Sequence, residues 1–217
     1  MRLEFVPFPF LTGLVILILF LAILWSRKYS LSYLFFFSVF WVYLLLVTGV
    51  TLFPMPIPDL TGGSEARQSA FYILSRVNPI PFDFGQFANL NPTYVFFREI
   101  VANIVLTMPF GFLISFLTPV KPRNIPMLAL AVGLGIETIQ LVMCLALGMA
   151  YRGVDINDAM MNALGVMFGY GFFSLFSWLF LAMTERLKLD HKGLFAYVHT
   201  ISSPIQPLSS SRPSSLP

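Results

Sequence analysis

The stretch Arg152-Gly-Val-Asp155-Ile-Asn-Asp158-Ala-Met-Met-Asn162-Ala-Leu-Gly165 places charged and amide side chains between two long apolar runs. The whole chain is 57% hydrophobic and only 11% charged, so ionisable groups are rare in it. If the stretch is helical, its polar residues follow steps of three, three and four, which gathers them within an arc of roughly 120°. Polar side chains inside membrane spans usually face a bundle or a cavity. The stretch therefore predicts a functional face near a membrane boundary.

Length and hydropathy predict an all-α membrane protein, a bundle of about five transmembrane helices with an outer interfacial helix and loop. The mean hydropathy of the 217 residues is +0.81, which is too apolar for an ordinary soluble domain. A hydrocarbon core of about 30 Å needs roughly 20 residues per helix. Apolar runs of this kind cover about 7–25, 31–53, 98–117, 125–147 and 156–183. The first run has no small-x-small cleavage site, so we interpret it as a retained span and not as a signal peptide.

Between the second and third spans lies a polar connection over about residues 54–97. Within it, residues 64–77 predict a short helix on the membrane surface, because Phe71, Leu74 and Val77 repeat at steps of three. The compact turn Asn78-Pro-Ile-Pro-Phe82 follows. We expect residues 1–30 to hold the first transmembrane helix, 31–190 to form the membrane domain, and 191–217 to be a cytoplasmic, largely disordered tail.

The distribution of charges predicts the orientation in the membrane. One side of a five-span arrangement is rich in lysine and poor in acids; its basic residues are Arg27, Lys28, Lys121, Arg123, Arg186, Lys188 and Lys192. Because short cytoplasmic loops carry the excess of Lys and Arg, we expect this side to be cytoplasmic in a multi-pass protein of the cell membrane. The amino terminus is then outside and the carboxyl terminus inside. The basic residues are scattered at helix ends, so the pI of about 9.1 reflects orientation signals and predicts no nucleic-acid partner.

In this topology the polar residues of the spans meet in the outer half of the membrane. Glu137 lies about ten residues before the end of its span, about 15 Å below the outer surface. A carboxylate at that depth either is protonated or finds a partner, and the neighbouring spans offer amides. The chain's one cysteine, Cys144, allows no intramolecular disulfide and no cysteine metal cluster. The candidate ligand-binding residues are Glu137, Gln140, Arg152, Asp155, Asp158, Asn162, Asn103 and Asn78.

Four sequence elements, taken in order, resemble the VanZ-like family of bacterial membrane proteins over about residues 40–180. The elements are Asn78-x-x-Pro81-Phe82, Asn103 followed by Pro109-x-Gly111, Ile136-Glu137-x-x-Gln140, and Arg152-x-x-Asp155-x-x-Asp158-x-x-x-Asn162-x-x-Gly165. The resemblance implies an integral membrane protein of the bacterial cell envelope. It also implies a link to resistance against the glycopeptide teicoplanin, with which the founding member is associated. It implies no reaction.

Three functions remain open on the sequence. The first is a non-enzymatic protein whose outer polar cleft binds an amphiphilic ligand, with Arg152 and the acids meeting its head group. The second is an intramembrane enzyme acting on a lipid-linked substrate, with Glu137 or the Asp155/Asp158 pair as general base or as Mg²⁺ ligands. The third is an assembly factor that holds a membrane-protein partner. The sequence has no Ser-x-x-Lys or Gly-x-Ser-x-Gly pattern and no histidine on the outer side, so we expect no serine–histidine or zinc mechanism. We assign no catalytic residue, cofactor or metal site, and an all-oxygen cation site built from Glu137, Asp155, Asp158 and Asn162 stays open. The sequence leaves two roles open for Asp155 and Asp158: to hold a cation or to pair with Arg152.

Overall fold

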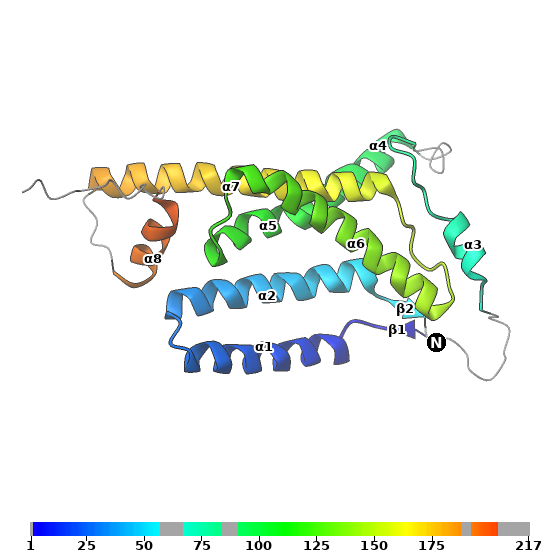
Figure 1. The fold of residues 1–217 in the computed structure, drawn as a ribbon, viewed down its shortest axis with the longest axis horizontal. Coiled ribbons are helices and arrows are strands. Elements are labelled where there is room, and N and C mark those ends of the chain that lie inside the picture. Colours follow the sequence, from blue (N-terminus) through cyan, green and yellow to red (C-terminus); the bar gives the residue numbers. More distant parts are fainter. Residues whose placement is uncertain (1, 57–66, 84–90, 188–191, 204–217) are drawn as a thin grey trace, which may run out of the picture.

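Five long helices lie side by side in the computed structural model, which describes residues 2–56, 67–83, 91–187 and 192–203 (Figure 1). These helices are α1 (Phe8–Ser26), α2 (Leu31–Leu52), α5 (Ala102–Leu117), α6 (Ile125–Leu147) and α7 (Ile156–Leu187). Five helical segments are long and apolar enough to cross a membrane, and they coincide with the five predicted spans. The prediction of an all-α, multi-pass membrane protein is therefore confirmed.

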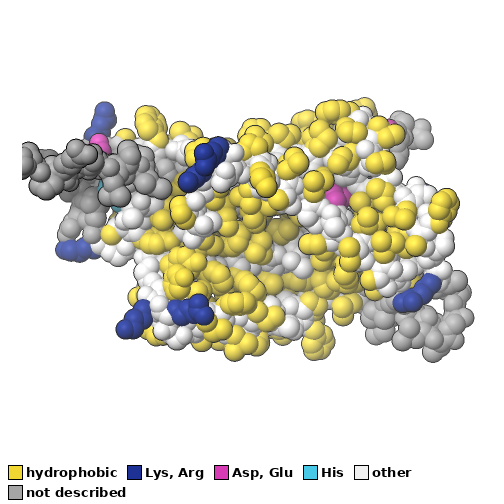
Figure 2. Space-filling model, in the orientation of Figure 1, with side chains coloured by type: hydrophobic (Ala, Val, Ile, Leu, Met, Phe, Trp, Pro, Cys, Tyr) yellow, Lys and Arg dark blue, Asp and Glu magenta, His cyan; other side chains and the backbone are white. Residues whose placement is uncertain are grey.

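The long helices differ from the predicted spans at their ends. The third span starts at Phe96, because a short helix α4 (Pro92–Val95) and a π-helical turn η2 (Phe96–Val101) run directly into α5. Helix α7 has 32 residues and is about 48 Å long, well beyond a hydrocarbon core of about 30 Å. On the face shown in Figure 2, hydrophobic side chains cover the length of the helices, and Lys and Arg lie mainly toward the end that carries α8 (Gly193–Ser202). That end is the one predicted to be cytoplasmic.

Helices α5 and α6 both pack on α7 at glycine positions. A Cβ atom added at Gly169 of α7 would lie 1.9 Å from the carbonyl oxygen of Met108 in α5. One added at Gly133 of α6 would lie 2.2 Å from the carbonyl oxygen of Ala159 in α7. Such small-residue contacts let helix backbones touch in membranes, where apolar surfaces alone give little drive for association. They place the polar residues of α5 and α6 against α7.

The amino-terminal helices form a hairpin that leans on α5. The indole nitrogen of Trp41 in α2 donates a hydrogen bond to the carbonyl of Gly13 in α1, at 3.0 Å. Tyr43 of α2 donates from its hydroxyl to the carbonyl of Leu106 in α5, at 2.8 Å. The segments flanking the hairpin, β1 (Arg2–Leu3) and β2 (Met55–Pro56), pair as two antiparallel strands. The hairpin is therefore tied together at both the middle and the outer end.

Helix α8 follows α7 at the opposite end of the bundle (Figure 1). A 3-10 turn, η3 (Pro122–Asn124), connects α5 to α6 at this end. The ring of Phe116 stacks on Phe36 at 4.2 Å between centroids, and Tyr197 of α8 stacks on the same Phe36 at 5.7 Å. The Tyr197 hydroxyl also donates to the carbonyl of Phe116. This ordered helix differs from the largely disordered tail predicted for 191–217, of which residues 204–217 lie outside the described part.

The predicted interfacial helix is shorter than expected. Helix α3 spans Ala70–Ser75 and begins at Ser69, whose hydroxyl accepts from the Tyr72 amide at 3.2 Å. Ile73 is buried against α6, whereas Phe71 and Leu74 are exposed. Residues 64–66 of the predicted helix lie outside the described part. Helix α3 is thus anchored through one side chain and presents the others outward, as a helix at a membrane surface does.

Candidate functional site

The turn at residues 78–83 is joined to the chain that enters α7. Asn78 and Asp155 form an isolated parallel bridge. The Asn78 amide donates to the carbonyl of Val154 at 2.9 Å, and the Ile156 amide donates to the carbonyl of Asn78 at 3.0 Å. Two of the candidate residues, 77 positions apart, are therefore in direct contact. The connection between the second and third spans is thus attached to the start of the fifth span.

Side chains reinforce this junction. The Asn78 amide group donates to a carboxylate oxygen of Asp155 at 3.1 Å and to the carbonyl of Asp83 at 2.9 Å. Asn157 accepts from the Phe82 amide at 2.6 Å and donates to the Asp83 carbonyl at 3.1 Å. Phe82 adopts a left-handed backbone conformation, with φ of 64°. Asn157 is only 2% exposed, so it acts as a clamp on the turn. Sequence reasoning missed Asn157, although it lies in the quoted stretch.

Asp155 precedes α7 and caps it. Its Oδ1 accepts from the Asn157 amide at 2.8 Å, which satisfies an amide that the helix leaves without an internal partner. Because α7 begins at Ile156, the expectation of one helical face running from Arg152 to Asn162 is wrong for Arg152 and Asp155. Glu137 of α6 accepts from the Asp155 amide at 3.0 Å, and both acids are at least 93% buried. Through this hydrogen bond, Glu137 of α6 holds the loop before α7 in place.

Arg152 and Gln140 hold the carboxyl-terminal end of α2. The Arg152 guanidinium donates to the carbonyl of Val50 at 3.2 Å and to that of Phe53. Gln140 donates to the carbonyl of Thr51 at 3.1 Å. The last carbonyls of a helix have no intrahelical partner, so these two side chains cap α2. Within the described residues Arg152 forms this cap in place of the ion pair with Asp155 or Asp158 that the sequence left open.

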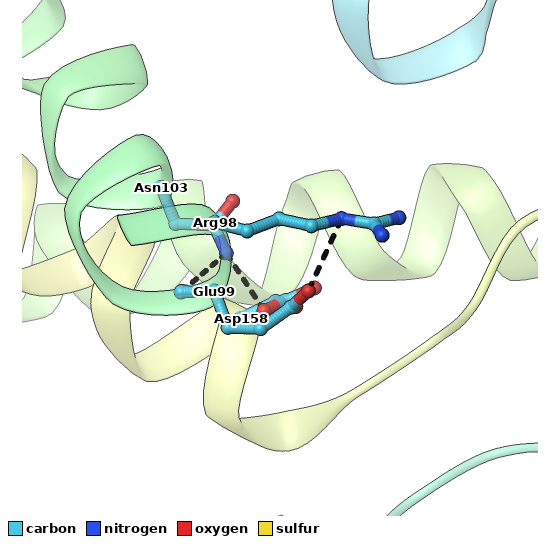
Figure 3. Close-up of polar contacts among 4 residues, drawn as sticks. All are labelled: Arg98, Glu99, Asn103 and Asp158. Carbon is cyan, nitrogen blue, oxygen red and sulfur yellow. Dashed lines mark hydrogen bonds and ion pairs between the residues drawn. The ribbon is translucent and has the colours of Figure 1, made fainter. Parts of the chain in front are cut away.

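A second polar group lies where α5 meets the start of α7 (Figure 3). Asn103 donates to Asp158 Oδ1 at 2.7 Å and to the Glu99 carbonyl at 2.8 Å, and Arg98 Nε pairs with Glu99 Oε1 at 3.3 Å. Asn103 thus links the Glu99 backbone to the Asp158 carboxylate. We call Arg98, Glu99, Asn103 and Asp158 the outer rim. The sequence predicts Asn103 and Asp158 as candidate site residues, but it marks Arg98 and Glu99 only as charges near the start of the third span.

One helical turn below the outer rim, Thr107 joins α5 to α7. Its hydroxyl lies 2.7 Å from the carbonyl oxygen of Asn162 and 3.0 Å from that of Asn103. Asn162 is 1% exposed, and its side-chain oxygen has no hydrogen-bond partner among the described residues. A spacing of four residues separates Glu99, Asn103 and Thr107 in the sequence. This spacing places their side chains on one helical face, so it could have predicted this group from the sequence alone.

The loop between α6 and α7 contains a further buried polar group. The Tyr151 hydroxyl also lacks a partner within the described residues. Burial raises the pKa of Tyr151, and the neighbouring Cys144 thiol raises it further. Cys144 itself is 1% exposed and packs as a core residue, with its Sγ 3.8 Å from the Arg152 carbonyl. The loop between α6 and α7 is therefore held against the bundle by the buried side chain of Cys144 and the buried hydroxyl end of Tyr151.

A cavity of about 360 Å³ lies between α2, α5 and α6. Figure 2 shows the surface hollowed in the middle of the bundle. Its walls are mostly aliphatic and aromatic. The lining residues are Tyr43, Leu44, Val47, Thr48, Thr51, Leu52, Thr107, Phe110, Ala131, Val132, Gly135, Ile136 and Ile139. The arrangement can hold an apolar group beside the polar residues of the outer end.

The described residues contain no group of three or more His, Cys, Asp or Glu side chains arranged to hold a metal ion. The eight candidate residues instead divide into three groups by what they contact. Asn78, Glu137, Gln140, Arg152 and Asp155 bond mainly to backbone groups, and Asn162 is enclosed. Asn103 and Asp158 belong to the outer rim, which reaches the surface through Arg98, whose side chain is 61% exposed.

The chain matches one family model, described as VanZ/LLP1, over residues 40–177. The match runs from the middle of α2 through most of α7 and includes all eight candidate residues. No curated protein and no solved structure matches the chain.

Proposed function

Because the chain belongs to the VanZ-like family, we propose that it acts in the bacterial cell envelope by binding an amphiphilic ligand at its outer end. We also propose that binding of this ligand gives resistance to a lipoglycopeptide of the teicoplanin type. The outer rim meets the ligand's head group, and the membrane helices hold its apolar part. The protein needs no reaction to do this.

The observation that carries the proposal is the composition of the outer rim. Two carboxylates and one amide are gathered beside a single guanidinium, at the end of an apolar bundle. The Arg98 side chain is 61% exposed and that of Glu99 is 13% exposed, so the group is reached from the surface through its guanidinium. Structural polar groups in membranes are usually enclosed by their partners, as Glu137 and Asp155 are here. A polar group with an exposed cation beside partly buried acids supports a ligand-binding role.

The chemistry of the outer rim favours a head group rich in hydrogen-bond donors. Carboxylates accept hydrogen bonds from hydroxyl, amide and ammonium groups, and charge-assisted bonds of this type are roughly twice as strong as neutral ones. Asn103 holds Asp158 in place at 2.7 Å, which leaves that carboxylate oriented before a ligand arrives. Sugars and amino groups, which glycopeptides carry, have such donors.

The proposed orientation puts the outer rim outside the cell, where envelope amphiphiles and glycopeptides are found. Its support is the charge distribution, since lysines and arginines gather in the loops at the α8 end. Labelling of single cysteines introduced at Ser30 and at Gln68 with a membrane-impermeant thiol reagent tests this. Labelling at Gln68 alone in intact cells is expected, and labelling at Ser30 alone would reverse the orientation.

The proposal is tested by teicoplanin susceptibility in a sensitive Gram-positive host. The host expresses the wild type, Glu99→Gln, Asp158→Asn, or the matched control Glu185→Gln near the other end of α7, with membrane abundance measured in parallel. Protection by the wild type and the control, with loss in the equally abundant rim variants, is expected. Absence of protection by abundant wild-type protein contradicts the proposal, and so does full protection by both rim variants.

A further inference from the structure

The end of the bundle that carries α8 combines exposed cations with an exposed apolar helix face. We infer that this end binds an anionic phospholipid of the surrounding leaflet. The lipid phosphate meets the Lys and Arg side chains of the loops, and an acyl chain lies against α8. The outer rim is at the opposite end of the bundle (Figure 1), so this inference does not depend on the ligand proposed there.

Basic side chains dominate the loops at this end, and all of them are exposed. They lie in the α1–α2 connection, in η3 with the residue before it, in the last turn of α7 and just before α8: Arg27, Lys28, Lys121, Arg123, Arg186 and Lys192. Glu185 is the one acidic side chain that the structure describes in these segments. On the face shown in Figure 2, Lys and Arg lie mainly toward this end. An anionic phosphate complements this charge, because each Lys or Arg near a membrane surface attracts anionic lipid.

Helix α8 packs on the helices that lead into these basic loops. Its Tyr197 stacks on Phe36, near the start of α2, at 5.7 Å between ring centroids. The Tyr197 hydroxyl donates to the carbonyl of Phe116, in the last turn of α5. Phe195 stacks on Phe180 of α7 at 6.2 Å. The basic residues therefore follow, along the chain, directly beyond the segments that α8 contacts.

The spacing along the helices sets the depth of the cations relative to α8. On α7, Arg186 lies six residues beyond Phe180, which is about 9 Å at 1.5 Å per residue. On the chain that leaves α5, Lys121 lies five residues beyond Phe116. The head-group layer is about 5–7 Å thick on each side of a bilayer. With α8 at the edge of the hydrocarbon core, these cations reach the level of the lipid phosphates.

Aromatic side chains place the membrane boundary at the same level. Trp25 and Tyr29 are exposed at the α1–α2 connection, and Tyr29 packs on Tyr33 at 4.7 Å between ring centroids. Trp178 is exposed on α7, two residues before Phe180. Trp and Tyr are enriched where hydrocarbon meets head groups. Helix α8 therefore lies near this boundary.

Helix α8 turns one side to the bundle and another outward. Val198 is 6% exposed, whereas Leu194 and Phe195 are 42% and 55% exposed. Lys192 comes directly before the helix. Exposed apolar side chains next to cations are typical of helices that lie in a membrane interface and bind anionic lipids. A lipid whose phosphate lies at the basic loops can thus place an acyl chain against Leu194 and Phe195.

The experiment measures quenching of the native tryptophans of the full chain in liposomes by lipids with brominated acyl chains. The probes are brominated phosphatidylglycerol, which is anionic, and brominated phosphatidylcholine, which is zwitterionic. Trp25 and Trp178 are exposed at the α8 end and report lipid bound there, whereas Trp41 is half-buried and gives a common background. We expect an association constant about fivefold higher for phosphatidylglycerol at low salt. This preference should be lost in about 1 M NaCl, where the Debye length is about 3 Å.

Two paired substitutions with the same change of charge locate the site. Lys121→Gln with Arg123→Gln removes two charges beside α8 and is expected to lower the phosphatidylglycerol preference about threefold. Arg67→Gln with Arg76→Gln removes two exposed charges at the other end of the bundle and should leave the preference unchanged. If the first pair elutes as aggregate, Arg27→Gln with Lys28→Gln takes its place.

The outcomes separate a lipid site from general attraction to a basic protein. Equal quenching by the two lipids at low salt overturns the inference. A preference that both pairs keep reports general accumulation of anionic lipid and also overturns it, as does a preference that the Arg67 and Arg76 pair loses. A preference lost only in the pair beside α8 supports the lipid site, whatever the teicoplanin result.

Discussion

Replacing Gly165 of α7 by alanine tests how closely α5 and α7 must approach for the outer rim to form. A Cβ at this position would lie 2.2 Å from Thr107 Oγ1 and 2.3 Å from the carbonyl oxygen of Ile104. Ordinary van der Waals contacts begin at 3.4 Å, so the two helices must separate by about 1 Å. The Asn103–Asp158 hydrogen bond is 2.7 Å long, and this separation stretches it beyond hydrogen-bond range.

The size of the effect follows from three contributions. Overpacking of this kind destabilises a protein by about 1–3 kcal/mol, and one lost hydrogen bond by about 0.5–1.5 kcal/mol. Alanine is favoured over glycine in a helix by about 1 kcal/mol, which offsets part of this. We expect Gly165→Ala to lower the free energy of unfolding by about 2 kcal/mol, a fall in Tm of about 4–8 °C for a chain of this size.

The assay is the loss of the monodisperse size-exclusion peak after heating the full chain in mild detergent. Gly171→Ala is the matched control, six residues further along the same helix, where the added Cβ meets nothing within 4 Å. The control should be as stable as the wild type or more stable by up to about 1 kcal/mol. If Gly165→Ala unfolds at the same temperature as Gly171→Ala, the close approach of α5 and α7 is not what holds the outer rim.

Substitutions at two further positions address the buried loop and α8. Glu137→Ala leaves the buried Asp155 amide without its acceptor and is expected to destabilise the protein by about 1–3 kcal/mol, whereas Glu137→Gln retains an acceptor and most of the stability in the same heating assay; equal losses would contradict this role. Tyr197→Ala removes both the ring contact with Phe36 and the hydrogen bond to Phe116, whereas Tyr197→Phe removes only the second. We expect limited proteolysis to cut before α8 faster in Tyr197→Ala than in Tyr197→Phe, and identical cleavage rates would show that the ring contact does not hold α8.

The five spans and the family could be predicted from the sequence because both depend on local information. A run of about 20 apolar residues needs no knowledge of its neighbours, and the predicted 125–147 span coincides with α6. Helix α8 was harder to predict from the sequence, because Tyr197 and Val198 hold it through contacts with residues far away in the chain. Composition around the serines and prolines says nothing about such contacts.

The candidate site could be located from the sequence, but its partners could not. The outer polar residues do gather at one end, yet spacing alone put Arg152 on a helical face that begins only at Ile156. Its actual partners are carbonyl oxygens of Val50 and Phe53, about 100 positions earlier, and no side-chain pattern marks a backbone acceptor. Glu99 was overlooked because its role depends on Asp158 across the α5–α7 contact. The cavity depends on the distances between α2, α5 and α6, and the hydropathy of the sequence carries no information about these distances.

The bond between Asn78 and Asp155 also sets the order in which the protein can be completed. The two residues are 77 positions apart, and Asn103 and Asp158 are 55 apart. A ribosome adds about 5–20 residues per second, so Asn78 waits about 4–15 s for its partner. During that time the third and fourth spans are synthesised, and Asn78 and Asn103 have only their local acceptors, the carbonyls of Asp83 and Glu99. A nascent chain that stops before α7 therefore lacks both carboxylate bonds, and the connection after α2 stays unattached until synthesis has passed Asp155.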